Sequence, residues 1–258
     1  QLELMKRTTF KVAVLLNITK DHIERHQSFK KYINEKIKIF NNQSQNDISI
    51  IGVDNEVTSS LVKKLKKKLY SKIITVSGRN NKADIYIKNK KLIINFNLRK
   101  NKISKIIDIG QFNNFLGVHN YQNIAAVYAI VLSLGFYKWK QIENSIKSFK
   151  ALPHRLQKVK QIKNITFIND SKATNIDATD QALKNFKNIF WILGGRLKER
   201  SLQKLKKHFF RIKHVFLVGE TKFLYQKYLK NFLECTIVKN LEEAVKLSCF
   251  LAKEKIKK

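Results

Sequence analysis

The sequence predicts an α/β protein of one to two domains. Short β-branched runs alternate with amphipathic segments along the 258 residues. This rhythm implies parallel strands with helices packed on the faces of the sheet. Hydrophobic residues make up 43% of the chain and aromatic residues 10%, which suits a sizeable core and excludes a disordered chain. At roughly 150 residues per domain, the length leaves room for a second domain.

In the first part of the chain the periodicity predicts a mixed sheet. The expected strands cover residues 11–19, 48–53, 72–76 and 102–109, with a hairpin over 84–97 that turns at 88–91. The expected helices cover residues 28–41, 56–70, 120–134 and 138–149. Gly135 follows the apolar helix directly and is a plausible stop for it.

The single proline marks a domain boundary, because the residue before a proline avoids helical dihedral angles. Leu152 and Pro153 therefore separate a first domain, 1–151, from a second, 152–258. In the second domain strands are expected at 165–169, 189–193, 214–218 and 236–238. Helices are expected at 175–185, 201–211, 221–231 and 241–255, which together predict a parallel sheet.

The charge of the chain raises an alternative function. Lys and Arg number 52 against 19 Asp and Glu, a formal net charge of +33, which would suit a basic nucleic-acid-binding protein. However, 44 of these cations are lysine and only 8 are arginine, whereas recognition of bases and phosphates favours arginine. Lys, Asn and Ile share A/T-rich codons, so genome composition explains the excess better. We expect no nucleic-acid partner.

Cysteine usage and hydropathy favour a cytoplasmic protein. Cys235 and Cys249 are the only cysteines, which excludes a disulfide scaffold. No stretch reaches the roughly 18 apolar residues of a membrane helix, and no signal peptide opens the sequence. We expect no membrane partner and a monomeric state.

A first polar cluster follows the strand expected at 11–19. His22 and His26 are four residues apart, but the zinc-protease pattern needs Glu after the first His, where Ile23 stands. The other interpretation is a polar turn into a helix. Lys36 lies fourteen residues after His22, one helical turn beyond Tyr32, and by itself would be read as a solvated lysine.

A second cluster opens the apolar helix. Asn120 and Asn123 lie three residues apart, so both amides can face one planar partner, and an amide suits a purine edge because it donates and accepts. Helix capping is the alternative.

No GxxxxGK[ST] phosphate loop, GxSxG elbow or cysteine metal spacing is found in the sequence.

The run NDSKATN at 169–175 is the most informative cluster, and Leu152-Pro153-His154-Arg155 precedes it. It joins a strand to a helix and places an acid, two hydroxyls and an ammonium within five residues. Asp170 could hold a ribose hydroxyl or a magnesium-bound water, and Lys172 could neutralise a phosphate. Thr174 or Asn175 could cap the next helix. Gly194 and Gly195 end the following strand, where a backbone can approach a ligand closely, and Lys198 comes next.

These motifs, in this order and spacing, resemble the Mur ligases, and NDSKATN resembles the D-glutamate-adding branch of that family. The resemblance covers nearly the whole chain. It implies a central ATPase domain, cut short at its start, over 1–151, and a Rossmann-like C-terminal domain, incomplete at its end, over 152–258. The resemblance places the UDP-sugar-binding domain and the phosphate loop before residue 1, and an SPAxxSFD segment after residue 258. We therefore expect the 258 residues alone not to catalyse ligation.

The resemblance also implies roles for single residues. His22 resembles a magnesium ligand, and Lys36 resembles a lysine that becomes a carbamate and holds the metal, since a carbamate offers the anionic oxygens that magnesium prefers. The remaining implied roles are adenine contacts for Asn120 and Asn123, phosphate and ribose contacts for Arg155 and Asp170, and contacts to D-glutamate and the reacting phosphate for Lys172, Thr174 and Lys198.

The reaction implied is ATP-dependent amide formation in the synthesis of peptidoglycan precursors for the cell wall. The carboxylate of UDP-N-acetylmuramoyl-L-alanine would attack the γ-phosphate of ATP to give an acyl phosphate, and the amine of D-glutamate would then displace phosphate. ATP and Mg²⁺ are the implied cofactors. Such chemistry depends on positioning and on charge neutralisation.

Overall fold

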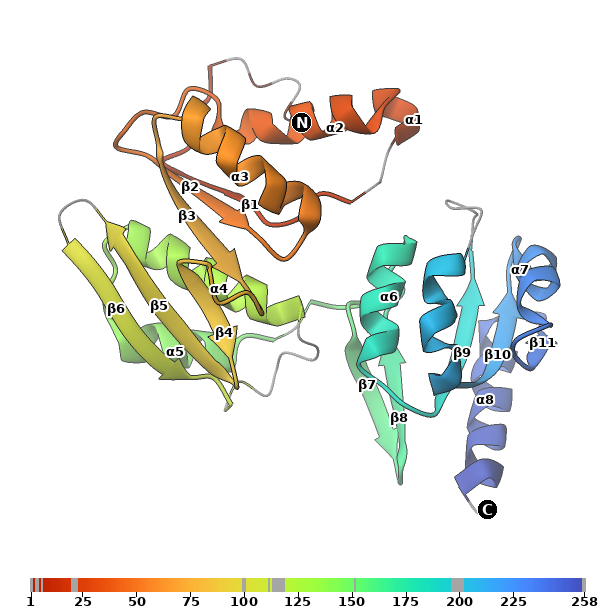
Figure 1. Ribbon diagram of the computed structural model, residues 1–258. Helices are drawn as coiled ribbons and strands as arrows, with labels where there is room; N and C mark the ends of the chain where they lie inside the picture. Colours follow the sequence, from red (N-terminus) through yellow and green to blue (C-terminus); the bar gives the residue numbers. More distant parts are fainter. Residues whose placement is uncertain are drawn as a thin grey trace. The chain divides into compact units, whose positions relative to one another are not determined.

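The computed structural model describes residues 2, 5, 7–19, 23–98, 101–110, 112, 119–150, 152–195 and 202–256. The chain divides into two compact units, Gln1–Lys150 and Ala151–Lys258 (Figure 1). Both units combine helices with parallel strands, which confirms the predicted α/β class. Within the described ranges, no helix has the length and hydropathy needed to cross a bilayer.

The first unit is a mixed sheet with helices on both faces. Its elements are β1 (Val12–Leu15), α1 (Ile23–His26), α2 (Phe29–Ile37), η2 (Lys38–Phe40), β2 (Ile48–Gly52), α3 (Glu56–Lys68), β3 (Lys72–Ser77), β4 (Ile85–Lys88), β5 (Lys91–Leu98), β6 (Asn101–Asp108), α4 (His119–Ser133) and α5 (Trp139–Ser148). The strands follow one another in the order β1 to β6. Strands β1 to β4 run parallel, and β5 and β6 add two antiparallel strands.

Side-chain alternation along the strands creates two cores in this unit. Ile50 of β2 joins the core formed with α4 and α5, whereas the next residue, Ile51, joins the core formed with α2 and α3. All five residues of β2 are buried, as expected for a strand covered on both faces. The helices therefore sandwich the parallel part of the sheet (Figure 1).

Local turn chemistry accounts for two of the predicted boundaries. Asn89 and Lys90 have φ of 51° and 57°, the left-handed conformation that a two-residue hairpin turn requires between β4 and β5. Gly135, with φ of +82°, ends α4, and the next amide, that of Phe136, donates to the carbonyl of Val131. This is the glycine stop that the sequence predicts.

The second unit contains a hairpin and a separate parallel sheet. Its elements are β7 (Gln157–Ile162), β8 (Ile165–Asn169), α6 (Ile176–Lys184), β9 (Ile189–Gly194), η3 (Gln203–Arg211), β10 (Ile212–Val218), α7 (Lys222–Leu229), β11 (Cys235–Ile237) and α8 (Leu241–Ile256). The parallel sheet has the order β11-β10-β9, and β7 pairs with β8 in antiparallel fashion. Helices α6 and η3 pack on one face of the parallel sheet and α8 packs on the other.

Three elements of the second unit differ from the sequence prediction. Strand β8, expected in the parallel sheet, pairs instead with β7 in antiparallel fashion. Strand β7 was not predicted, because its apolar residues Val159 and Ile162 do not alternate and remain 60% and 36% exposed. The helix expected at 201–211 is a 3-10 helix over Gln203–Arg211. The buried N-cap Leu202 and two of the three buried residues of the helix, Leu205 and His208, are three apart, which matches the three residues per turn of a 3-10 helix; the third buried residue is Phe209.

A buried acid joins α6 to η3. Asp180 is 2% exposed, and its carboxylate pairs with Lys207 Nζ at 2.7 Å, Lys184 Nζ at 3.0 Å and His208 Nε2 at 3.0 Å. Burial by itself would raise the pKa of Asp180, but the hydrogen bonds from Lys207, Lys184 and His208 outweigh it and lower the pKa to about 2. The carboxylate therefore stays charged wherever the protein is folded near neutral pH.

We predict that the stability of the second unit falls as pH drops from about 4 to about 2. The pKa of Asp180 is lower in the folded than in the unfolded chain, so its contribution is complete above the unfolded value, about 4, and is lost as pH falls through about 2. The loss should be about 2 kcal/mol in urea unfolding. Asp180→Asn should remove a similar amount at pH 7. Asp177→Asn is the matched control on α6, because Asp177 also pairs with a lysine but is more exposed; an equal loss in both variants would contradict the prediction.

A second prediction concerns Tyr128 in the core of the first unit. Its ring is fully buried beside Trp139, and its hydroxyl has no hydrogen-bond partner within the described part of the chain. Burial, and to a lesser extent the charge of Glu143, raises the pKa of Tyr128 well above its usual range. Tyr128→Phe should therefore keep or raise the free energy of unfolding by up to about 1 kcal/mol. Tyr128→Leu, which leaves a cavity, should lower it by about 2 kcal/mol or more. A loss of over 1 kcal/mol in the Phe variant would show that the hydroxyl is partnered.

Candidate functional site

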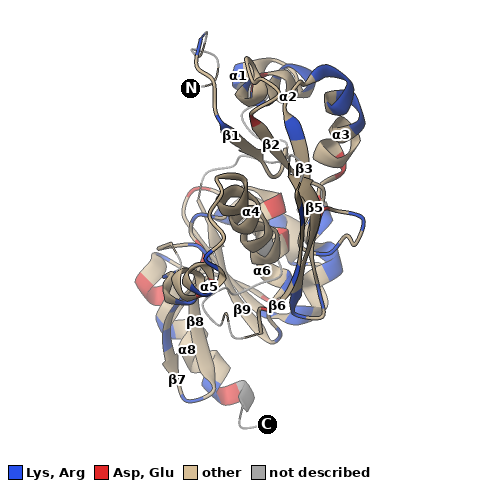
Figure 2. Cartoon of the chain, turned by 90° about the vertical axis from the view of Figure 1, so that its left-hand side faces the viewer, with Lys and Arg blue, Asp and Glu red and all other residues tan. Residues whose placement is uncertain are grey.

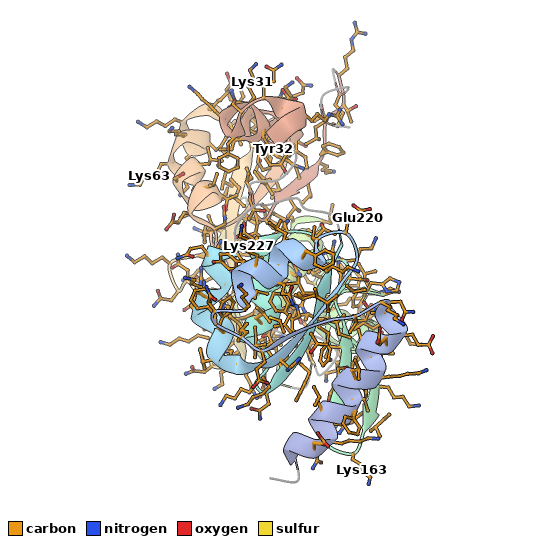
Figure 3. The ribbon with its side chains drawn as sticks, turned by 90° about the vertical axis from the view of Figure 1, so that its right-hand side faces the viewer. Lys31, Tyr32, Lys63, Lys163, Glu220 and Lys227 are labelled. Carbon is orange, nitrogen blue, oxygen red and sulfur yellow. The ribbon has the colours of Figure 1, made fainter. Side chains whose placement is uncertain are left out.

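Lys36 lies in the last turn of α2, beside the ring of Tyr32. Ser28 caps this helix by accepting a hydrogen bond from the Lys31 amide, which fixes its start. The Lys36 ammonium lies 5.3 Å from the centre of the Tyr32 ring, and that ring lies 5.1 Å from His26. Tyr32 is on the buried side of α2, whereas Lys31 points outward (Figure 3). His22 lies outside the described residues.

Of the two predicted magnesium ligands, only Lys36 lies among the described residues. Magnesium prefers oxygen ligands, and no group of three His, Cys, Asp or Glu side chains that could hold a metal occurs in the described ranges. The ammonium of Lys36 would repel the ion, so Lys36 fits it only as a carbamate, which carries two anionic oxygens. The metal-binding roles of Lys36 and His22 therefore both stay predictions.

The first turn of α4 carries the two amides predicted to face a planar ligand. Asn123 Nδ2 donates a hydrogen bond to Asn120 Oδ1 at 3.1 Å, so the two side chains lie next to each other as their spacing predicts. Asn123 is exposed, and Asn120 is half-buried. Helix α4 has no Lys, Arg, Asp or Glu, in contrast to α2 and α3, whose ribbons carry lysines (Figure 2).

Two glycines lie where the first turn of α4 meets the sheet. A Cβ on Gly52 would overlap the Leu16 carbonyl oxygen and would lie 2.6 Å from Gln122 Nε2. A Cβ on Gly78 would lie 3.1 Å from the Gln122 amide nitrogen. The Leu16 carbonyl therefore requires glycine at position 52, whereas a side chain at position 78 would force the first turn of α4 to shift by a few tenths of an ångström. Sequence reasoning missed both residues, although a glycine directly after a β-branched run is a usable signal.

Asp54 ties together the loops that follow β2 and β3. Its carboxylate accepts hydrogen bonds from the Ser77 hydroxyl and from the Gly78 amide, the latter at 2.7 Å. Arg79 Nη2 donates to the Asp54 carbonyl at 2.7 Å. An open cavity of about 640 Å³ adjoins these loops; it is lined by Val53, Asp54, Glu56, Ser59, Ser60, Lys63, Arg79 and Asn80. Sequence reasoning did not single out this cavity.

In the second unit, the two predicted segments fold against each other. The Asp170 carboxylate accepts a hydrogen bond from the Leu156 amide at 2.9 Å, and Asn169 Nδ2 lies 3.0 Å from His154 Nδ1. The Lys172 amide donates to the His154 carbonyl at 3.1 Å. The structure therefore brings the Pro153–Arg155 turn to the turn after β8. His154 and Asn169 are the residues here whose roles the sequence did not predict.

The turn after β8 also settles which residue caps α6. Asn175 accepts a hydrogen bond from the Ala178 amide at 2.8 Å, so Asn175 and not Thr174 is the cap. Thr174 is exposed, and so are the side chains of Lys172 and Arg155. The turn therefore exposes the hydroxyl of Thr174 and the ammonium of Lys172 to solvent. Its backbone amides donate to the carbonyls of His154 and Asp170.

The glycines at the end of β9 permit a close approach of the backbone. A Cβ on Gly194 would overlap the Val218 carbonyl oxygen of the neighbouring strand β10. Gly195 has φ of +115°, and its carbonyl accepts a hydrogen bond from the Thr221 hydroxyl at 2.9 Å. Lys198, predicted to act beside these glycines, lies outside the described residues.

Known protein families match both units of the chain. The Mur ligase middle domain matches residues 1–131, and the Mur ligase, glutamate ligase domain matches residues 154–255. The UDP-N-acetylmuramoylalanine–D-glutamate ligase of Rickettsia felis is 38% identical over 248 residues, which are 96% of this chain and 54% of that protein. The ligase of the same name from Rhodospirillum rubrum is 33% identical over 95% of this chain and 51% of that protein. The chain thus spans about half the length of these relatives.

Solved structures share the fold at low sequence identity. MurF from Acinetobacter baumannii has a TM-score of 0.67 at 17% identity and covers 95% of this chain and 54% of its own. The folylpolyglutamate synthase of Mycobacterium tuberculosis, solved with ADP and AMPPCP, has a TM-score of 0.65 at 14% identity, with 95% of this chain and 57% of its own covered. At such identities the likeness concerns the fold. Because the middle-domain match alone covers half of the sequence, as the motifs predict, the chain belongs to the Mur ligase family.

Proposed function

We propose that this chain is part of an ATP-dependent ligase that joins D-glutamate to UDP-N-acetylmuramoyl-L-alanine in peptidoglycan precursor synthesis. The observation that carries the proposal is the interlocked turn at Asp170 and His154, which holds the NDSKATN segment in a chain that is 38% identical to a ligase of that name. The chain covers only about half of that relative, so the activity belongs to the longer protein. We propose a cytoplasmic monomer.

The proposed reaction forms an amide in two steps. A carboxylate oxygen of the UDP-sugar substrate attacks the γ-phosphorus of ATP, and the bond to ADP breaks to leave an acyl phosphate. The amine of D-glutamate then attacks the acyl carbon, phosphate leaves, and the amine loses a proton. Positioning of the reactants and neutralisation of the phosphate charge supply most of the catalysis in such transfers.

In the first unit, the proposed roles concern adenine and metal. Asn120 and Asn123 contact the adenine edge, a role supported by their adjacent amides on the first turn of α4. Lys36, as a carbamate, and His22 hold Mg²⁺, which when bound would neutralise phosphate charge. The half-buried position of Lys36 against Tyr32 supports this role, because it limits the orientations of the side chain.

In the second unit, the proposed roles concern phosphate, ribose and D-glutamate. Arg155 contacts the nucleotide phosphates and Asp170 the ribose; both lie in the interlocked turns. Lys172, Thr174 and Lys198 contact D-glutamate and the reacting phosphate. The exposure of Lys172 and Thr174 supports their availability to a ligand.

We also propose that residues 1–151 form the C-terminal part of the central ATPase domain and residues 152–258 an incomplete C-terminal domain. The division of the chain between Lys150 and Ala151 supports the boundary.

A chimera tests the proposed function. The matched half of the Rickettsia felis ligase would be replaced by this chain, and phosphate release would be measured with ATP and UDP-N-acetylmuramoyl-L-alanine. Release is expected to depend on D-glutamate and to be absent from the 258-residue chain alone. Equal release with L-glutamate or D-alanine in place of D-glutamate would overturn the substrate assignment.

In this chimera, Lys36→Ala is expected to abolish ligation, because the carbamate oxygens are lost with the lysine. Added acetate or formate should restore part of the activity by supplying carboxylate oxygens to the same metal. Lys31→Ala on the outer face of α2 is the matched control and should retain activity. Full activity in Lys36→Ala would exclude the carbamate role.

Asp170→Ala in the chimera should raise the KM for ATP more than the KM for D-glutamate. We expect at least about a tenfold difference, equivalent to about 1.4 kcal/mol, since a charge-assisted hydrogen bond to ribose would be lost. Asp177→Ala, in the first turn of the nearby helix α6, is the control for general destabilisation. The opposite order of the two KM changes would refute the ribose assignment.

A further inference from the structure

Gln122 is a buried amide at the start of α4 for which the proposed function gives no role. It is 4% exposed, whereas its neighbour Asn123 is exposed. Its Oε1 accepts a hydrogen bond from Asn17 Nδ2 at 3.1 Å. Asn17 follows β1, 105 residues earlier in the chain, so this pair joins the end of β1 to the first turn of α4.

Stability alone does not explain a glutamine at this position. Gln122 Nε2 is buried and has no hydrogen-bond partner within the described ranges. An unpaired buried amide costs about 1–3 kcal/mol, and an apolar side chain of the same size would avoid that cost. The amide therefore needs another reason to be there.

The surroundings of Gln122 indicate that reason. Its Nε2 lies against Gly52 at the end of β2, where a Cβ would come within 2.6 Å. Its backbone nitrogen lies against Gly78, just after β3. Gln122 thus contacts the carboxyl ends of β2 and β3, and its hydrogen bond with Asn17 connects it to the carboxyl end of β1 as well. Any rotation of the first turn of α4 would break this set of contacts.

We infer that Gln122 is a positioning residue that fixes the rotation of the first turn of α4 and so aims the amides of Asn120 and Asn123 at the adenine of ATP. The inference rests on the proposed function for the identity of the ligand. Gln122 itself does not touch the nucleotide; it acts through the two asparagines, whose side chains hydrogen-bond to each other on the same turn.

Gln43 provides a matched control for this role. It is a buried glutamine in the same unit, 6% exposed, and its Nε2 donates to the carbonyls of Phe10 at 2.8 Å and Ile48 at 3.0 Å. Ile48 begins β2, whereas Gly52 ends it, so Gln43 lies at the opposite end of that strand. Loss of the Gln43 amide should cost stability without affecting the first turn of α4.

The experiment measures binding of AMPPNP to the 258-residue chain and its variants by displacement of a fluorescent ATP analogue. Gln122→Met and Asn17→Leu should each weaken binding about tenfold, and the double variant should be no weaker than either single one. Asn17→Asp should remain within about twofold of the wild type, because Gln122 can turn its amide and donate to the carboxylate. Gln43→Met should also bind within about twofold.

Hydrogen exchange without nucleotide gives a second, independent measurement. Amides of Asn123 and Ile124 should exchange several-fold faster in Gln122→Met and unchanged in Gln43→Met. Wild-type affinity in Gln122→Met would overturn the inference. Failure of the wild-type chain to bind AMPPNP would count against the proposed nucleotide site. In that case the hydrogen-exchange rates alone test the positioning role of Gln122, and unchanged rates in Gln122→Met would overturn that role.

Discussion

The candidate site of the first unit depends on one contact. In this contact the first turn of α4 packs against the carboxyl ends of β1, β2 and β3. Parallel strands end at one edge of a sheet, and ligands of such sheets bind there. Here Gly78 allows the backbone of α4 to approach, since a Cβ there would lie 3.1 Å from the Gln122 amide nitrogen, and Gly52 leaves room for the Gln122 side chain. The two glycines therefore allow the first turn of α4 to pack at this edge, and Gln122 determines which way the amides of Asn120 and Asn123 face.

In the second unit, the corresponding constraint is a pair of turns that hold each other. The Asp170 carboxylate accepts the Leu156 amide, and His154 contacts both Asn169 and the Lys172 backbone. His154 and Leu156 have φ of 66° and 44°, a conformation that costs non-glycine residues free energy. The hydrogen bonds from the turn after β8 offset that cost. The two motifs thus form one structural unit.

Periodicity predicted most elements, because buried strands and amphipathic helices leave a clear hydrophobic pattern. It failed for β7, whose side chains are mostly exposed, and for η3, where a spacing of three indicates a 3-10 helix. The motifs also selected the segments that the structure brings together around Asp170 and His154. Neither periodicity nor motifs could predict the pairing of Asn17 with Gln122 or of Asp180 with His208, since these partners are 105 and 28 residues apart in the sequence. Such contacts depend on tertiary packing and leave no local pattern.

The distribution of charge bears on the choice between a ligase and a nucleic-acid-binding protein. Lys31, Lys63 and Lys163 point away from the ribbon and away from one another (Figure 3). The first turn of α4, where the sequence predicts a ligand, belongs to a helix without charged residues. A nucleic-acid surface requires cations concentrated where the ligand binds, because binding comes largely from phosphate contacts. In the first unit the lysines of α3 and the predicted adenine contacts on α4 are on different elements, and this separation favours the ligase.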